Sequence, residues 1–387
     1  MSRVGTLFGY GFRVFFLSCA ACAAAVMTAW VGVFTFGWSV AGSRPMAWHA
    51  HEMLFGVGSA AIAGFLLTAV PNWTGTERLH GRALAALWLL WLAGRMAFWV
   101  SYPLTTGAAA LAARAIDLAF LPLLAVIVAR PIIATGNRRN LIVIAVLAGL
   151  FVANLALTLM PARGPVLALD LVTLLMILIG GRIAPLFTRN WLVRKGLDGD
   201  VVQSHSWLDI ASLVTMLLVL ITDLAGLSPG IVGPCAILAA LASLGRLIEW
   251  QGWRAWSDPL VWVLHLGYLW IVMALMIRGF GHLTELVSPR AWIHALGIGA
   301  MGTLIIGIMP RVSLGHTGRT LTLPRGGSIM LWLMTVAAVT RTGNALGWFD
   351  HAWALTTAGL AWIIAFLLFI GHFLPVLSAP RPDGRPG

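Results

Sequence analysis

Charge is scarce in this chain. Of its 387 residues only 10% are charged, lysine occurs once, at Lys195, and 60% are apolar, with a mean hydropathy of +0.91. An ordinary soluble domain carries about 25% charged residues. The three cysteines, Cys19, Cys22 and Cys235, all lie in apolar segments, which argues against a disulfide framework. The composition excludes a soluble globular protein, a disordered chain and a disulfide scaffold.

Long unbroken apolar runs fill the sequence instead. Only helices and closed barrels satisfy every backbone polar group in lipid, and a barrel would show short alternating strands. We therefore predict an all-α integral membrane protein with about twelve transmembrane helices of about 20 residues each. The expected spans are 14–36, 46–70, 82–101, 107–130, 140–160, 165–188, 204–225, 230–250, 259–278, 291–310, 327–343 and 351–375.

The loops between these spans are short, so residues 1–387 are expected to form a single transmembrane domain with a short cytoplasmic tail at 379–387. Of the 25 basic residues, 17 fall on the side that carries both termini. Cytoplasmic loops of membrane proteins carry this excess, so both termini are predicted to be cytoplasmic. No basic stretch is long enough to bind nucleic acid. The five basic residues of the opposite side are Arg44, Arg163, Arg278, Arg290 and Arg341.

Ten histidines stand out against this low charge, and neutral imidazole is a common ligand of metals and haem. The predicted orientation divides them between the two membrane faces. If His49 and His51 lie on one helix, their side chains point about 200° apart. They would therefore bind two different centres, or one would be a ligand and the other would contact that ligand. The periplasmic set is His49, His51, His282, His294 and His351, and the cytoplasmic set is His80, His205, His265, His316 and His372.

Ionisable residues within the spans are costly and therefore candidates for function. Arg95, Arg114, Asp117, Asp170 and Arg182 fall in this class, and pairing between helices is the simpler interpretation. Arg114 and Asp117 are spaced i, i+3, which would let them pair on one helix face. The alternative is a transporter that uses these groups for a substrate or an ion.

A weak internal similarity relates the second and tenth spans, and chance in glycine-rich helices remains an alternative explanation. The aligned positions are His51 with His294, Gly56 with Gly299, Gly64 with Gly307, and Thr74-Gly75 with Thr317-Gly318. Related second and tenth spans suit a bundle of three four-helix units with facing histidines. Haem-copper oxidases have such a bundle, although the copper-site histidines of their sixth and seventh spans have no equivalent here.

Four sequence blocks resemble the signature blocks of the NnrS family. They are His49-Ala50-His51-Glu52-Met53, the run from Gly64 to Gly75, the run from Gly181 to Thr188, and the run from Arg311 to Arg319, and the terminal Pro380–Gly387 fits as well. The resemblance covers nearly the whole chain. It implies a haem- and copper-containing bacterial inner-membrane protein of nitric oxide metabolism and of defence against nitrosative stress. The positions carried over are His49, His51, Glu52, His316 and Arg319.

Residues and resemblance together predict b-type haem held between the second and tenth spans by His49 or His51 with His294. His351, Glu52 and His282 would complete a metal or proton-handling shell, with Glu52 as the catalytic carboxylate. His265 and His316 would mark a second site, for copper or iron, and Arg319 would pair with haem propionates.

The expected activity is reduction of nitric oxide to nitrous oxide. Its electrons would come from a quinol or from a periplasmic donor. The sequence leaves two alternatives open. One is a non-enzymatic haem protein that senses or buffers nitric oxide, and the other is the transporter.

Overall fold

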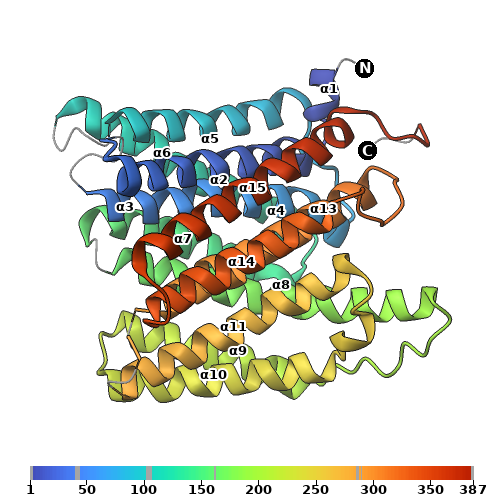
Figure 1. Cartoon of the computed structure of the whole chain (residues 1–387). Helices are drawn as coiled ribbons and strands as arrows, with labels where there is room; N and C mark the ends of the chain where they lie inside the picture. The colour runs from blue at the N-terminus through green and yellow to red at the C-terminus, as the bar shows by residue number, and fades with distance from the viewer. Residues whose placement is uncertain are drawn as a thin grey trace. The chain divides into compact units, whose positions relative to one another are not determined.

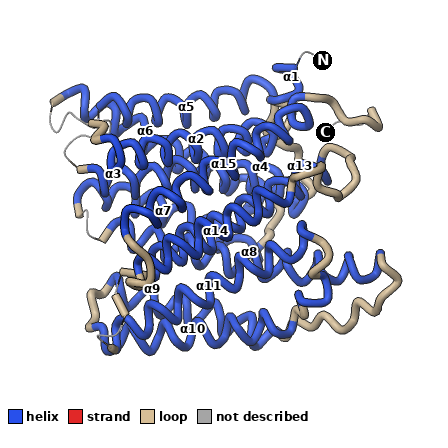
Figure 2. Tube along the Cα trace, in the orientation of Figure 1, coloured by secondary structure: helices blue, strands red, loops and turns tan. Residues whose placement is uncertain are grey.

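The computed structural model describes residues 3–39, 44–101, 107–160, 163–284, 287–288 and 290–384. Figure 1 shows them as a succession of helices from α1 to α15. Helices and their connecting loops account for the described part of the chain, in which no strand occurs (Figure 2). The all-α fold predicted from the apolar runs is therefore confirmed.

A helix occupies each of the twelve expected spans. Eleven of these segments are long and apolar enough, among the described residues, to cross a membrane. The twelfth, α14, is a helix of 18 residues that is less apolar than the others. The bounds are α1 Arg3–Leu7, α2 Gly11–Phe36, α3 Pro45–His51, α4 Ser59–Thr74, α5 Gly81–Ser101, α6 Ala108–Ala134, α7 Leu141–Leu159, α8 Gly164–Arg194, α9 Ser206–Leu224, α10 Pro229–Glu249, α11 Pro259–Leu283, α12 Trp292–His294, α13 Thr303–His316, α14 Ser328–Ala345 and α15 His351–Ser378.

Local backbone chemistry sets several helix ends. Gly37 and Gly75 follow α2 and α4 with φ of 68° and 67°, a left-handed conformation that glycine adopts without steric cost. At the start of α11, the Asp258 side chain accepts a hydrogen bond from the backbone N–H of Leu260, and Pro259 occupies the first helical position. Such caps explain why observed bounds differ by a few residues from those expected from hydropathy.

The chain divides into two compact units, each with its own packed helices. The first comprises 1–168, 309–322 and 362–387, and the second comprises 169–308 and 323–361. In the first unit α2 packs on α4, α5 on α6, and α6 on α7. In the second unit α10 packs on both α9 and α11. Both units bury large apolar side chains, such as Phe15 and Phe16 in the first and Trp250 in the second.

A π-helical segment interrupts two of the spans. Glu52–Gly58 follows His51 directly, and Ala295–Gly302 follows His294 directly. Gly318, like Gly75, then has a positive φ, of 68°, just beyond the end of its helix. The internal similarity found in the sequence therefore extends to backbone conformation. Because π segments occur frequently at functional sites, both positions are candidates for function.

Candidate functional site: a buried ionic network

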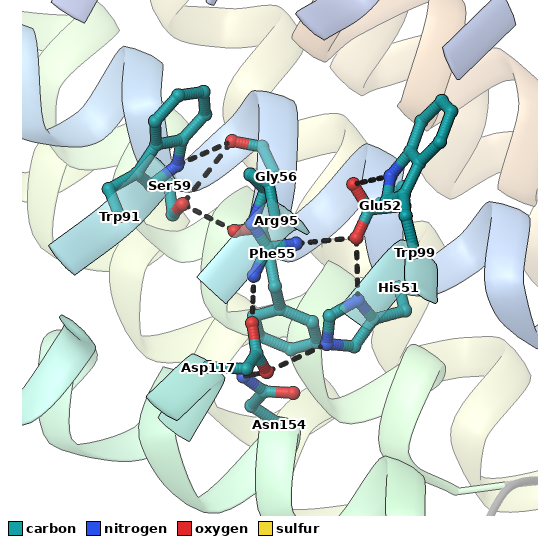
Figure 3. Close-up of polar contacts among 10 residues, drawn as sticks. All are labelled: His51, Glu52, Phe55, Gly56, Ser59, Trp91, Arg95, Trp99, Asp117 and Asn154. Carbon is teal, nitrogen blue, oxygen red and sulfur yellow. Dashed lines mark hydrogen bonds and ion pairs between the residues drawn. The ribbon is translucent and has the colours of Figure 1, made fainter. Parts of the chain in front are cut away.

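A closed network of ionic and polar side chains lies inside the first unit (Figure 3). Three helical segments supply its ionisable groups: His51 and Glu52 lie at the junction of α3 with the π segment, Arg95 on α5, and Asp117 on α6. Each of these four side chains is buried, and Glu52 is fully enclosed. Isolated charges are costly in such surroundings, so the arrangement of partners decides their state.

The Glu52 carboxylate accepts hydrogen bonds on both of its oxygens. Oε1 lies 2.5 Å from Arg95 Nη1 and 3.1 Å from His51 Nδ1. Oε2 accepts a hydrogen bond of 2.9 Å from the indole N–H of Trp99. These donors hold Glu52 in one orientation against the His51 ring.

The Asp117 carboxylate faces the other edge of the same imidazole. Oδ2 lies 3.0 Å from His51 Nε2 and accepts a 3.0 Å hydrogen bond from Asn154 Nδ2 on α7. Oδ1 pairs with Arg95 Nη2. The pairing of Asp117 with Arg114, predicted from their spacing, is wrong: among the described residues no ion pair joins them, and Arg114 is exposed. Asp117 turns inward from α6, where a partner on another helix is closer.

Both ring nitrogens of His51 therefore face carboxylate oxygens. A neutral imidazole donates from only one nitrogen, so one proton beyond the neutral ring is needed to make both contacts favourable. If His51 is an imidazolium, its charge and that of Arg95 balance Glu52 and Asp117. A proton bound in this way would be able to move between the imidazole and either carboxylate, as a proton-handling site requires.

Glycines bring these side chains together. A Cβ on Gly94 would lie 3.2 Å from the backbone Cα of Asp117, so α5 and α6 approach closely at the residue beside Arg95. A Cβ on Gly56 would lie 3.1 Å from Glu52 Oε2 and 3.5 Å from Arg95 Cδ. The space left by these two glycines is what admits the guanidinium and the carboxylate.

The π segment beside the network also exposes backbone carbonyls that need partners, because lipid offers none. Ser59 Oγ donates to the carbonyl of Phe55 at 2.5 Å, and Trp91 Nε1 donates to that of Gly56 at 3.3 Å (Figure 3). Side chains of α4 and α5 thus stabilise the irregular backbone that positions Glu52.

The second unit contains a similar but separate ionic cluster. Arg278 on α11 pairs with Asp170 on α8 at 2.6 Å and with Asp223 on α9. The Arg278 guanidinium also lies 4.2 Å from the ring centroid of Trp292. The simpler interpretation of the intramembrane charges was pairing between helices. The structure shows such pairs for Arg95, Asp117 and Asp170.

The other candidate residues of the first unit do not join the network. The His49 ring stacks on Trp30, with centroids 4.0 Å apart, so it points away from His51 as the helical spacing predicted. His316 lies at the end of α13 against Phe12, and Arg319 donates to the carbonyl of Thr317 at 3.3 Å.

The expected tail lies close to His316 in the same unit. Arg381 donates to the His316 carbonyl at 3.2 Å and pairs with Asp383, whose carboxylate raises the pKa of Arg381. Residues 385–387 of this tail lie outside the described residues. Arg381 therefore ties the tail to the last turn of α13.

Four of the candidate histidines belong to the second unit. His265 is buried on α11, His282 and His294 are half-buried, and His351 is exposed, with Nδ1 3.3 Å from Asn344 Oδ1. The described residues contain no group of three or more His, Cys, Asp or Glu placed to hold a metal ion. The haem and metal roles of these residues stay predictions.

Two members of the network were not among the residues singled out from the sequence, Asn154 and Trp99. Asn154 is the one amide side chain in the largely apolar helix α7. Its polar side chain could have marked it in the sequence as a candidate partner for a buried charge. Trp99 gave no such signal, because the chain has 19 tryptophans and most of them suit packing or the membrane interface.

These features define a class of protein: a multi-pass helical membrane protein with an ionic site buried among its helices. The family model described as NnrS protein matches residues 6–381. The chain belongs to the NnrS family, and this membership links it to nitric oxide. No curated protein matches the chain.

Proposed function

We propose that this protein is a haem-binding protein of the bacterial inner membrane that reduces nitric oxide to nitrous oxide, in denitrification or in defence against nitrosative stress. Family membership supports the link to nitric oxide. The finer proposal rests on one observation, the buried imidazole of His51 held between two carboxylates.

The reaction needs protons inside the membrane. Two molecules of nitric oxide, two protons and two electrons give one nitrous oxide and one water. The His51 network holds a movable proton in a site closed to bulk water, and its second carboxylate can accept a replacement proton once the first has left. In this proposal Glu52 and His51 pass protons toward the substrate, and Arg95 keeps the carboxylates oriented.

The proposed haem ligands differ in one respect from those expected from the sequence. His51 does not fit an axial ligand, because both of its nitrogens are engaged by carboxylates. His49 of the first unit and His294 of the second are separate candidate ligands, since each is half-buried on or beside an irregular helix. Bound haem would supply an iron that binds nitric oxide and passes electrons. Copper or iron near His265, His282 or His316, and haem contacts of Arg319 and His351, remain part of the proposal.

The test is nitrous oxide production by the purified protein with nitric oxide and a reductant. The proposal expects about one nitrous oxide for two nitric oxide molecules consumed, and Soret and α bands in the reduced-minus-oxidised optical spectrum. Tight binding of nitric oxide with no nitrous oxide would make the protein a sensor or buffer. Absence of the haem bands would contradict the proposal altogether.

One observation favours the transporter as a second candidate. Each unit buries an arginine between two carboxylates, Arg95 in the first and Arg278 in the second. Paired proton-binding sites of this kind suit proton-coupled transport. Proton uptake coupled to solute flux in sealed vesicles, together with the absence of haem, would favour this alternative.

A further inference from the structure

The ionic cluster of the second unit differs in its charges from the network around His51. Arg278 Nη1 donates to Asp170 Oδ1 at 2.6 Å, and Nη2 of the same guanidinium pairs with Asp223. In the first unit a histidine also contacts both carboxylates, whereas here the described residues place no histidine within ion-pair distance of either one. With both carboxylates ionised, the second cluster would therefore carry one negative charge in excess.

Water has little access to this cluster. Asp170 on α8 is 0% exposed, Arg278 on α11 is 1% exposed, and the side chain of Asp223 near the end of α9 is 20% exposed. The ring of Trp292 covers the guanidinium, with its centroid 4.2 Å from Arg278 Cζ. An excess charge is costly in such surroundings, and a buried carboxylate avoids that cost by binding a proton.

One carboxylate oxygen of the cluster lacks a partner. Asp170 Oδ2 is buried, and no donor within the described part of the chain reaches it. The carboxyl groups of Asp170 and Asp223 also lie within hydrogen-bonding distance of each other. Two ionised carboxylates at such a distance repel each other, while a single proton between them gives an O–H···O hydrogen bond. The geometry therefore has a place for one proton.

Other charged groups of the second unit are not placed to balance the cluster. His282, one turn beyond Arg278 on α11, is half-buried and forms no ion pair with either carboxylate. Arg246 is also buried in this unit, but its Nε lies 2.8 Å from Asp209 Oδ1 instead. Among the described residues, the charges that act on Asp170 are those of Arg278 and Asp223.

We propose that Asp170 and Asp223 share one bound proton, so that the cluster is a proton-binding site of the second unit, and that this proton exchanges with the aqueous phase through Asp223. Asp223 is the partly exposed member, and it lies near the end of α9 on the side that the basic residues predict to be periplasmic. Ionisable groups at membrane depth commonly belong to proton pathways. The inference goes beyond the proposed reaction, because it requires neither haem nor nitric oxide.

The experiment is infrared difference spectroscopy of the purified full-length protein in lipid nanodiscs near neutral pH, without nitric oxide. The spectrum of Asp170→Asn is subtracted from that of wild type, which isolates the C=O stretch of the carboxylic acid that the substitution removes. Wild type should show this band and Asp170→Asn should lack it. Transfer of wild type to D₂O should shift the band to lower frequency, because the proton exchanges through Asp223.

Sharing of the proton predicts that Asp223→Asn loses the same band. In either variant the remaining carboxylate balances Arg278, so it no longer needs a proton. His282→Gln keeps both carboxyl groups and should retain the band. Asp198→Asn, at an exposed aspartate between α8 and α9, is the matched control for loss of a carboxylate and should retain the band as well.

Identical spectra of wild type and Asp170→Asn in the carboxylic acid region would overturn the proposal. Stabilisation of wild type by sodium, absent from Asp170→Asn, would also overturn it, because a sodium ion would then occupy the place of the proton. Retention of the band in Asp223→Asn would contradict sharing, and a band insensitive to D₂O would contradict exchange. If Asp170→Asn does not fold, Asp223→Asn allows the same subtraction. Since no step uses nitric oxide or haem, failure here is distinguishable from failure of the proposed reduction.

Discussion

His51 acquires its chemistry from its two neighbours rather than from its type. The same imidazole, placed against apolar side chains, would be a candidate iron ligand. Between Glu52 and Asp117 both of its nitrogens are engaged, which suits the proton transfer proposed above. The sequence could predict that His51 and Glu52 matter, because charge is so rare in the chain. It could not predict the contact with Asp117, which lies 66 residues away and depends on how α6 packs.

Arg95 is the residue whose loss should cost the network most. Arg95→Leu leaves two buried carboxylates with one shared imidazole, and removing one partner of a buried ionic group costs about 3–5 kcal/mol of unfolding free energy. The measurement is thermal or denaturant unfolding in detergent. Arg114→Leu, at an exposed arginine of α6, should change stability by about 0.5 kcal/mol or less. Equal effects of the two substitutions would contradict the network.

Hydropathy predicted the positions of the membrane-spanning helices well, because each span needs a charge-free run of a fixed length. It could not predict the π segment Glu52–Gly58, since glycine and apolar residues are compatible with an ordinary helix as well. Nor could it show that α5 and α6 approach closely at Gly94. The i, i+3 rule favoured Arg114 as the partner of Asp117, and helix packing favoured Arg95 instead.

Gly94 provides a test of that close approach. In Gly94→Ala the added Cβ would press on the Asp117 backbone, and overpacking of this kind costs about 1–3 kcal/mol. Gly371→Ala is the matched control, because a Cβ there meets no atom within 4 Å, and it should be neutral or slightly stabilising. The two variants are compared by their unfolding midpoints. An identical response would show that the contact is looser than described.

At the scale of the whole molecule, the distribution of basic residues predicts both termini in the cytoplasm. Cysteine substitutions near each end, at the exposed Pro382 and at the half-buried Leu7, should react with a membrane-impermeant reagent only after the cells are opened. A cysteine at Arg163, between α7 and α8, should react in intact spheroplasts. The background variant has the native Cys19, Cys22 and Cys235 replaced by alanine. The reverse labelling pattern would contradict the orientation.

In the proposed reaction His51 bears a proton and does not ligate iron. The decisive measurement is the haem content and the nitrous oxide formation of purified His51→Phe, determined in the same preparation, with His49→Phe beside it. We expect His51→Phe to keep its haem and to form nitrous oxide about 100-fold more slowly, in line with loss of a general acid. Loss of haem from His51→Phe, or an unchanged rate with full haem, would contradict the account.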